Sequence, residues 1–234
     1  MADMRQPITE STPVGQIARV FPLAIPIFEE FDIDYACRGG RSVADAARAA
    51  GFESSAVLDA LQAVCSNDIA IEPRVSDLVH AIVTQHHRFE DVRFRELAAR
   101  FEAPEFTTVE GGRIRTLLLD LASSVSAHML REERNLFPRL EELDLHPHRV
   151  RAGSISRPLL NEFLEHDVVH ERLTKIRELA LRLHASSAHA GLLAELDDLY
   201  RAVHRHMHLE NNVLIPRAID LENEFKTRKN EISA

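Results

Sequence analysis

Four long segments, which together make up most of the second two thirds of the chain, have apolar residues at helical spacing. The apolar residues recur every three or four positions, and the strict alternation typical of strands does not occur in them. Short connections between long amphipathic helices favour antiparallel neighbours, so the pattern predicts an all-α, up-down-up-down four-helix bundle. The four segments are residues 76–101, 112–143, 156–184 and 191–223.

The first part of the chain consists of shorter helical phrases broken by proline and glycine. Ser42 is a good N-cap and Gly51 a good helix end, so a helix is predicted between them, and a second helix is predicted with Ser54 or Ser55 as its cap. We therefore expect a small helical domain, then the bundle, then a short tail. The expected bounds are 1–72, 73–225 and 226–234.

Charge and composition narrow the function classes. The formal net charge of −9 argues against a surface built to bind nucleic acid. No apolar stretch approaches the roughly 18–20 residues of a membrane helix, so no membrane association is expected. Two cysteines are too few for a secreted disulfide scaffold, and the sequence predicts a cytoplasmic protein.

A repeated phrase lies in the second and fourth segments. "HMLREERNLFPR" runs from His128 to Arg139, and "HMHLENNVLIPR" runs from His206 to Arg217. Each copy places a histidine four residues before a glutamate, which puts both side chains on one helix face. The first and third segments each supply a single histidine at matching spacing, so the repeat indicates a duplicated helix hairpin around one site.

Helical phase at about 100° per residue places six of these polar side chains on the apolar faces of the four segments. A single inward histidine is more often a hydrogen-bonded core residue than a ligand. Burying several imidazoles and carboxylates together costs several kcal/mol for each, and a metal cation offsets that cost. The donor types favour iron, manganese or zinc. The predicted ligands are His86, His128, Glu132, His166, His206 and Glu210.

The other histidines are weighed in the same way. His170 lies one turn after His166 and also points inward, beside Glu90, so a seventh ligand, an outer-sphere group and a core residue all stay open. His204 and His208 fall on the opposite side of their helix and are predicted to be surface residues. The rest are expected on helix flanks or in connections, without an arguable partner: His80, His87, His146, His148, His184 and His189.

These residues resemble the hemerythrin-like domain, a four-helix bundle around a non-haem di-iron centre. The repeated phrase, together with "FEEFDIDYACRGGRSVADAARAAG" before it, more narrowly resembles the iron-sulfur cluster repair di-iron proteins, the repair of iron centres family. The resemblance implies two iron ions with oxo or hydroxo and carboxylate bridges, the two glutamates being the bridging residues. That family commonly has adjacent cysteines, but Ala36 precedes Cys37 here, so a thiol role falls to Cys37 alone or across a homodimer. Cys37 is also interpretable as a small residue at a tight turn.

The resemblance implies repair of iron-sulfur clusters damaged by nitric oxide or oxidants, with the damaged proteins as partners and iron donation as one route. An oxygen-binding or nitric oxide-binding sensor is the alternative, and His170 as an additional ligand would favour it. Metal-dependent reduction of peroxide or nitric oxide is a third hypothesis, for which the sequence offers no legible substrate pocket. Whether the protein is an enzyme is left open.

Overall fold

The computed structural model describes residues 7–65, 73–146, 156–183 and 187–232, and they form helices joined by short connections. Within these ranges there is no β-strand, only one isolated bridge between Pro13 and Ser42. The predicted all-α class and helical bundle are therefore confirmed. The chain divides into two compact units, Met1–Pro73 with Met207–Pro216, and Arg74–His206 with Arg217–Ala234.

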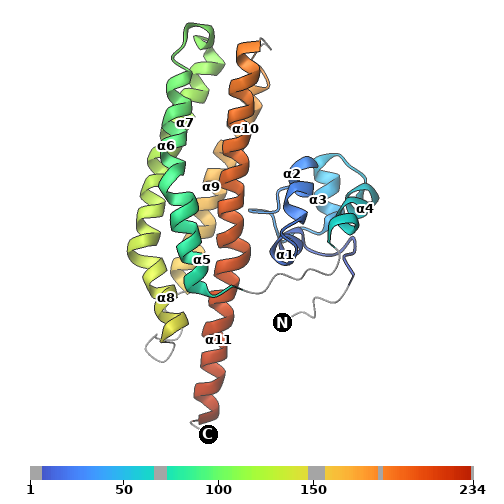
Figure 1. Ribbon diagram of the computed structural model, residues 1–234, viewed down its shortest axis with the longest axis vertical. Helices are drawn as coiled ribbons and strands as arrows, with labels where there is room; N and C mark the ends of the chain where they lie inside the picture. Colours follow the sequence, from blue (N-terminus) through green and yellow to red (C-terminus); the bar gives the residue numbers. More distant parts are fainter. Residues whose placement is uncertain (1–6, 66–72, 147–155, 184–186, 233–234) are drawn as a thin grey trace. The chain divides into compact units, whose positions relative to one another are not determined.

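The second unit is built from long helices that lie side by side in Figure 1. α6 packs against α7, α5 packs against α8, and α7 also packs against α9. Since α5 begins the first helix and α8 ends the second, these contacts fix the two as antiparallel. Their bounds are α5 Val75–Ile82, α6 Arg88–Arg100, α7 Val109–Arg131, α8 Phe137–Leu145, α9 Ser156–Ala180, α10 Ser187–His208 and α11 Ile215–Ile232.

Apolar residues of these helices form the core, as the spacing predicts. Ile114, Leu118 and Leu121 of α7 are fully buried, at intervals of four and three residues that keep them on one face. Thr108 caps this helix, because its hydroxyl accepts a hydrogen bond from the Gly111 N–H at 3.0 Å. The tail expected at 226–234 is helical as far as Ile232.

Within the described residues, three of the four bundle helices contain a π-helical turn. These turns are η1 Val83–His87, η3 Glu132–Leu136 and η5 Leu209–Leu214. A π-helical turn holds more residues than an α-helical turn, so each residue advances by a smaller angle and the helix face shifts. All three turns contain or adjoin predicted ligands, which is typical of π-helical turns at functional sites.

The first unit contains the short helices α1 Val14–Val20, α2 Ala24–Glu30, α3 Val43–Ala50 and α4 Ser54–Val64, together with the segment Met207–Pro216. The predicted caps of α3 are confirmed: the Ser42 hydroxyl accepts from the Asp45 N–H at 3.1 Å, and Gly51 has φ 83°. A serine cap on α4 is wrong, because Glu53 is the N-cap residue and Ser54 donates to Glu10 instead.

The segment Met207–Pro216 is held to the loop before α3 by its amide side chains. Asn212 Nδ2 donates to the carbonyl oxygens of Tyr35 and Ala36, both at 3.1 Å. Asn211 Nδ2 donates to the Ala36 carbonyl at 3.3 Å. These bonds tie two parts of the chain that are about 175 residues apart in sequence into one compact unit.

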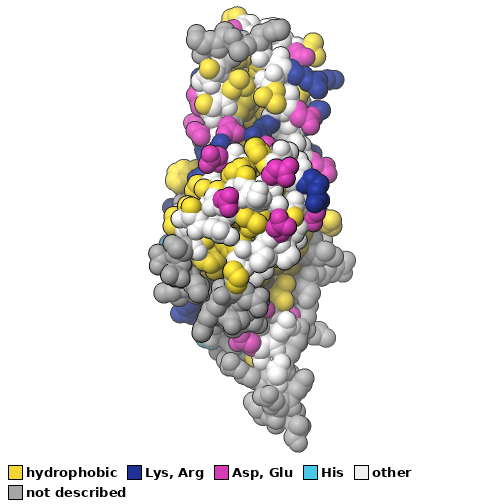
Figure 2. All heavy atoms as spheres, turned by 90° about the vertical axis from the view of Figure 1, so that its right-hand side faces the viewer, with side chains coloured by type: hydrophobic (Ala, Val, Ile, Leu, Met, Phe, Trp, Pro, Cys, Tyr) yellow, Lys and Arg dark blue, Asp and Glu magenta, His cyan; other side chains and the backbone are white. Residues whose placement is uncertain are grey.

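Acidic and basic side chains are interspersed on the face that Figure 2 shows. This distribution agrees with a composition of 28 Lys and Arg against 37 Asp and Glu, and the coloured, described part of that face has no large patch of a single charge sign. None of the helices within the described ranges is long and apolar enough to cross a membrane.

Candidate metal centre

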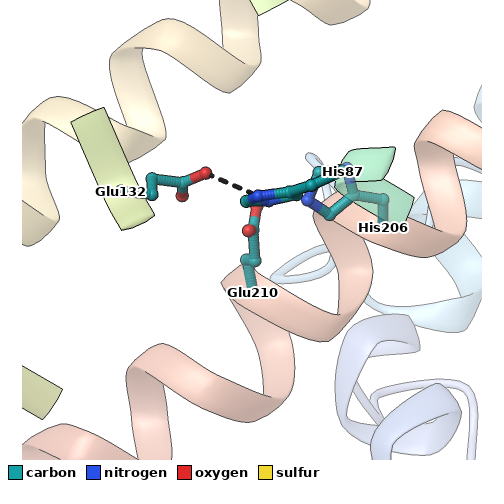
Figure 3. Close-up of side chains that lie close together, drawn as sticks. All are labelled: His87, Glu132, His206 and Glu210. Carbon is teal, nitrogen blue, oxygen red and sulfur yellow. Dashed lines mark ion pairs between the residues drawn. The ribbon is translucent and has the colours of Figure 1, made fainter. Parts of the chain in front are cut away.

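Four buried side chains from three bundle helices converge on one point, shown in Figure 3. We call them the Glu210 cluster: His87, Glu132, His206 and Glu210, each of which offers one donor atom within 4.8 Å of the others. His87 Nε2 lies 3.4 Å from Glu132 Oε2. His206 and Glu210 stand one turn apart on the continuous helix formed by α10 and η5.

A second group of donors shares Glu132 with the first. We call it the Glu162 cluster: His128, Glu132, Glu162 and His166, whose donor atoms also lie within 4.8 Å of one another. His128 Nε2 lies 3.4 Å from Glu132 Oε2 and 3.1 Å from His166 Nε2. The Glu132 carboxylate thus belongs to both clusters, as a bridging ligand requires.

The structure brings together five of the six predicted ligands, divided between the two clusters, and adds two donors that the sequence analysis did not select. His87 joins the Glu210 cluster and is 5% exposed, although it was expected on a flank. His86 lies outside these two clusters but forms a third group of donors with Glu90 and His206, with its Nδ1 3.4 Å from Glu90 Oε1, so its ligand role stays a prediction. Glu162 stands four residues before His166, a spacing that could have drawn attention to it.

Three other histidines lie outside both clusters. The His170 Nδ1 atom is 3.1 Å from His204 Nε2, so within the second unit this imidazole faces another histidine. The surface prediction for His204 and His208 is wrong, because they are 3% and 2% exposed. The Tyr200 ring lies tilted against His204 with centroids 4.1 Å apart, and the Tyr35 and His208 rings meet edge to face with centroids 5.3 Å apart. Of the histidines expected in or near connections, His148 and His184 lie outside the described residues.

The buried histidines of the clusters also have carboxylate neighbours on their outer nitrogen atoms. His87 Nδ1 is 2.8 Å from Glu133 Oε1, and His128 Nδ1 is 2.8 Å from Glu165 Oε2. Glu165 also pairs with Arg131. These contacts leave the Nε2 atoms of both rings directed toward Glu132.

His206 makes the equivalent contact with Glu90, at 3.0 Å between Nδ1 and Oε2. Burial by itself would raise the pKa of Glu90, but the charges and hydrogen bonds of His206 and His86 outweigh burial and lower this pKa to about 2. The Glu90 carboxylate is therefore ionised at neutral pH inside the bundle.

The donor set fits a metal cation. Glu132 and Glu210 are each 1% exposed, and burying two carboxylates close together is costly unless a positive charge lies between them. Neutral imidazole and carboxylate oxygen are ligands that iron, manganese and zinc accept. The two clusters thus give a chemically consistent place for two cations that share Glu132.

Cys37 lies in the first unit, in the loop after Asp34. Its N–H donates to Asp34 Oδ1 at 2.9 Å, and its thiol lies 3.7 Å from the Met207 sulfur. The side chain is partly buried and forms no disulfide. A chemical role for this thiol stays a prediction.

Known proteins resemble the chain over most of its length. An iron-sulfur cluster repair protein YtfE of Yersinia pseudotuberculosis serotype O:1b (strain IP 31758) is 27% identical over 222 residues, which cover 88% of this chain and 96% of the relative. Proteins of the same name from Yersinia pseudotuberculosis serotype O:3 (strain YPIII) and Yersinia pestis (strain Pestoides F) match with the same identity and coverage. The resemblance drawn from the sequence is confirmed.

Two family matches divide the chain in the order expected. Residues 10–65 match a domain of unknown function, DUF542. Residues 77–218, more than half of the chain, match the hemerythrin HHE cation binding domain and include every member of both clusters. The chain belongs to the hemerythrin HHE cation binding domain family.

Proposed function

We propose that this protein holds two iron ions and takes part in the repair of iron-sulfur clusters damaged by nitric oxide or oxidants, acting as an iron donor. The observation that carries the proposal is the position of Glu132, which is common to two buried clusters of histidine and carboxylate donors. Relatives named iron-sulfur cluster repair protein, similar over nearly their whole length, support the repair role.

The ligand assignment follows the two clusters. His87, His206 and Glu210 hold one ion, His128, His166 and Glu162 hold the other, and Glu132 bridges them. Iron bound in this way supplies a redox-active ion whose nitrogen and oxygen ligands exchange more readily than a closed set of thiolates. The protein's own part is to keep the donors deprotonated, oriented and shielded from bulk water.

In this role the partners are iron-sulfur proteins with damaged clusters, and iron is the transferred cargo. We propose a cytoplasmic location, with nitric oxide or oxygen as small molecules that the centre meets during stress. The alternative function, a sensor of oxygen or nitric oxide, would be favoured if His170 were an additional ligand. The contact of His170 with His204 does not support that ligand role.

Repair is tested by adding the iron-loaded protein to a cluster-dependent dehydratase whose cluster has been damaged by nitric oxide, under anaerobic conditions with a thiol reductant. We expect faster recovery of dehydratase activity than with the same amount of free ferrous iron. If dehydratase activity recovers no faster than with free iron, the proposal is wrong.

The matched control is the Glu132→Gln variant mixed with the same amount of ferrous iron. Gln keeps the size of the side chain but loses the charge shared by the two clusters, so this mixture is expected to behave like free iron. If the variant repairs as well as the native chain, the repair activity does not come from this centre.

A further inference from the structure

A carboxylate stands behind three of the buried histidines that line the two clusters. Glu133 and Glu165 accept from His87 and His128, and their side chains are 40% and 39% exposed. Glu90, which accepts from His206, is 3% exposed. Of these three outer carboxylates, Glu90 is the one that the bundle encloses.

The geometry at His206 determines which nitrogen faces the cluster. A neutral imidazole has one N–H and one lone pair, and the hydrogen bond made by one nitrogen decides the state of the other. With Nδ1 donating to Glu90 Oε2 at 3.0 Å, Nε2 keeps its lone pair for a cation. Because solvent does not screen this contact, it orients the ring more strongly than an exposed carboxylate would.

His86 completes the arrangement on the other side of Glu90. Its Nδ1 lies 3.4 Å from Glu90 Oε1, so the two carboxylate oxygens face two different imidazoles. The rings of His86 and His206 also stack, with centroids 5.1 Å apart and planes 22° from parallel. Glu90 is thus fixed between the two rings, and His86 packs against the ring that Glu90 orients.

We propose that Glu90 is a positioning residue of the metal centre, which holds His206 with Nε2 toward the Glu210 cluster, and that His86 keeps Glu90 in place. This inference rests on the proposed metal centre, but it does not depend on the identity of the metal or on the repair reaction. In this inference His86 does not bind the ion directly, contrary to the prediction from the sequence, but supports the residue that orients a ligand.

The test is titration of the metal-free full-length protein with Co²⁺, whose visible absorption reports coordination without presupposing iron. In Glu90→Gln we expect one of the two bound ions to weaken by about 10–100-fold and its absorption band to shift, while the other ion keeps its affinity. Glu133→Gln is the matched control, and it should change the affinity less because solvent already screens that carboxylate.

His86→Phe provides a second variant, which retains the ring stacking and removes the N–H. It is expected to weaken the same ion as Glu90→Gln, by a smaller factor, and it tests the proposal if Glu90→Gln fails to fold. Equal weakening of both ions would show a merely structural role and overturn the inference, as would native affinity in both variants.

Two other outcomes separate this inference from the assignments around it. Loss of a third Co²⁺ ion in both variants, with the other two unaffected, would mean that His86, Glu90 and His206 are themselves a metal site, and the positioning role would be wrong. If the native chain binds no Co²⁺ at all, the metal centre itself fails. Failure of cluster repair alone leaves the Co²⁺ result, and therefore this inference, intact.

Discussion

The Nε2 atom of His87 lies 3.4 Å from the Oε2 atom of Glu132, across two helices and out of contact with solvent. A uniform helix would place His87 about 140° from Ile82, away from the core. The π-helical turn Val83–His87 lowers the rotation per residue and brings His87 back to the buried face. One irregular turn thus decides which of two adjacent histidines meets Glu132.

Substitution of the two adjacent histidines should therefore have different effects. We expect His87→Ala to lose one of the two ions, because this change removes a donor of the Glu210 cluster. His86→Ala should still bind both ions, one of them less tightly. Metal content of anaerobically purified protein checks this, and retention of both ions by His87→Ala would contradict it.

The two glutamates of the repeated phrase should also differ. Glu132 belongs to both clusters, so Glu132→Ala is expected to release both ions, whereas Glu210→Ala should mainly affect the ion held with His87 and His206. Stoichiometry after gel filtration distinguishes the two results. Identical losses in both variants would mean that Glu210 bridges the ions as well.

Glu162 provides a test of the Glu162 cluster. Glu162→Gln should weaken the ion held with His128 and His166, because a neutral amide is a poorer ligand for a hard cation than a carboxylate. Glu165→Gln is the matched control on the same helix, since Glu165 contacts His128 Nδ1 and Arg131 but belongs to neither cluster. Competition with a coloured chelator measures both affinities, and equal affinities in the two variants would exclude Glu162 as a ligand.

Removal of the metal should lower the stability of the bundle. Without cations, the buried carboxylates of Glu132 and Glu210 face each other's charge, while a ligand present at 100 times its dissociation constant stabilises the folded state by about 2.7 kcal/mol. Thermal unfolding followed by circular dichroism, with and without chelator, should show a higher midpoint for the metal-bound protein. An unchanged midpoint would speak against a buried site.

The glycine pair after Cys37 gives a prediction for the first unit. A Cβ atom on Gly39 would lie 2.7 Å from the Tyr35 carbonyl oxygen and 3.0 Å from the Gly15 Cα, both backbone atoms, whereas one on Gly40 would meet nothing within 4 Å. Gly39→Ala should therefore destabilise this unit by about 1–3 kcal/mol, and Gly40→Ala should have little effect. Urea unfolding of both variants measures the difference in their free energies of unfolding. Equal values would contradict the prediction and would mean that the loop moves aside to accept the added methyl group.

The sequence predicted the orientation of side chains correctly wherever the helix is regular. His128 and His206 lie in regular helix, and Glu132 and Glu210 are the first and second residues of the π-helical turns that follow, so each His–Glu pair still shares a face that the spacing of four predicts. His87 lies at the end of such a turn, and counting at a constant angle could not place it.

The burial of His204 and His208 was not predicted, for a different reason. Helical phase predicts which face of its own helix a side chain lies on. It does not predict which other parts of the chain pack against the face opposite the core. His204 meets His170 and Tyr200, and His208 meets Tyr35, so both are buried on a face that an isolated helix would expose. Only tertiary contacts reveal this second buried surface.

Glu210, Asn211 and Asn212 are consecutive, yet they serve two purposes. Glu210 belongs to the Glu210 cluster, while the two amides donate to the carbonyl groups of Tyr35 and Ala36. Asn211 is 7% exposed, so loss of that acceptor would leave a buried donor to be satisfied some other way. The π-helical turn that carries Glu210 is therefore also the turn whose amides hold the loop before α3, so a substitution in it can disturb the packing of the first unit as well as the cluster.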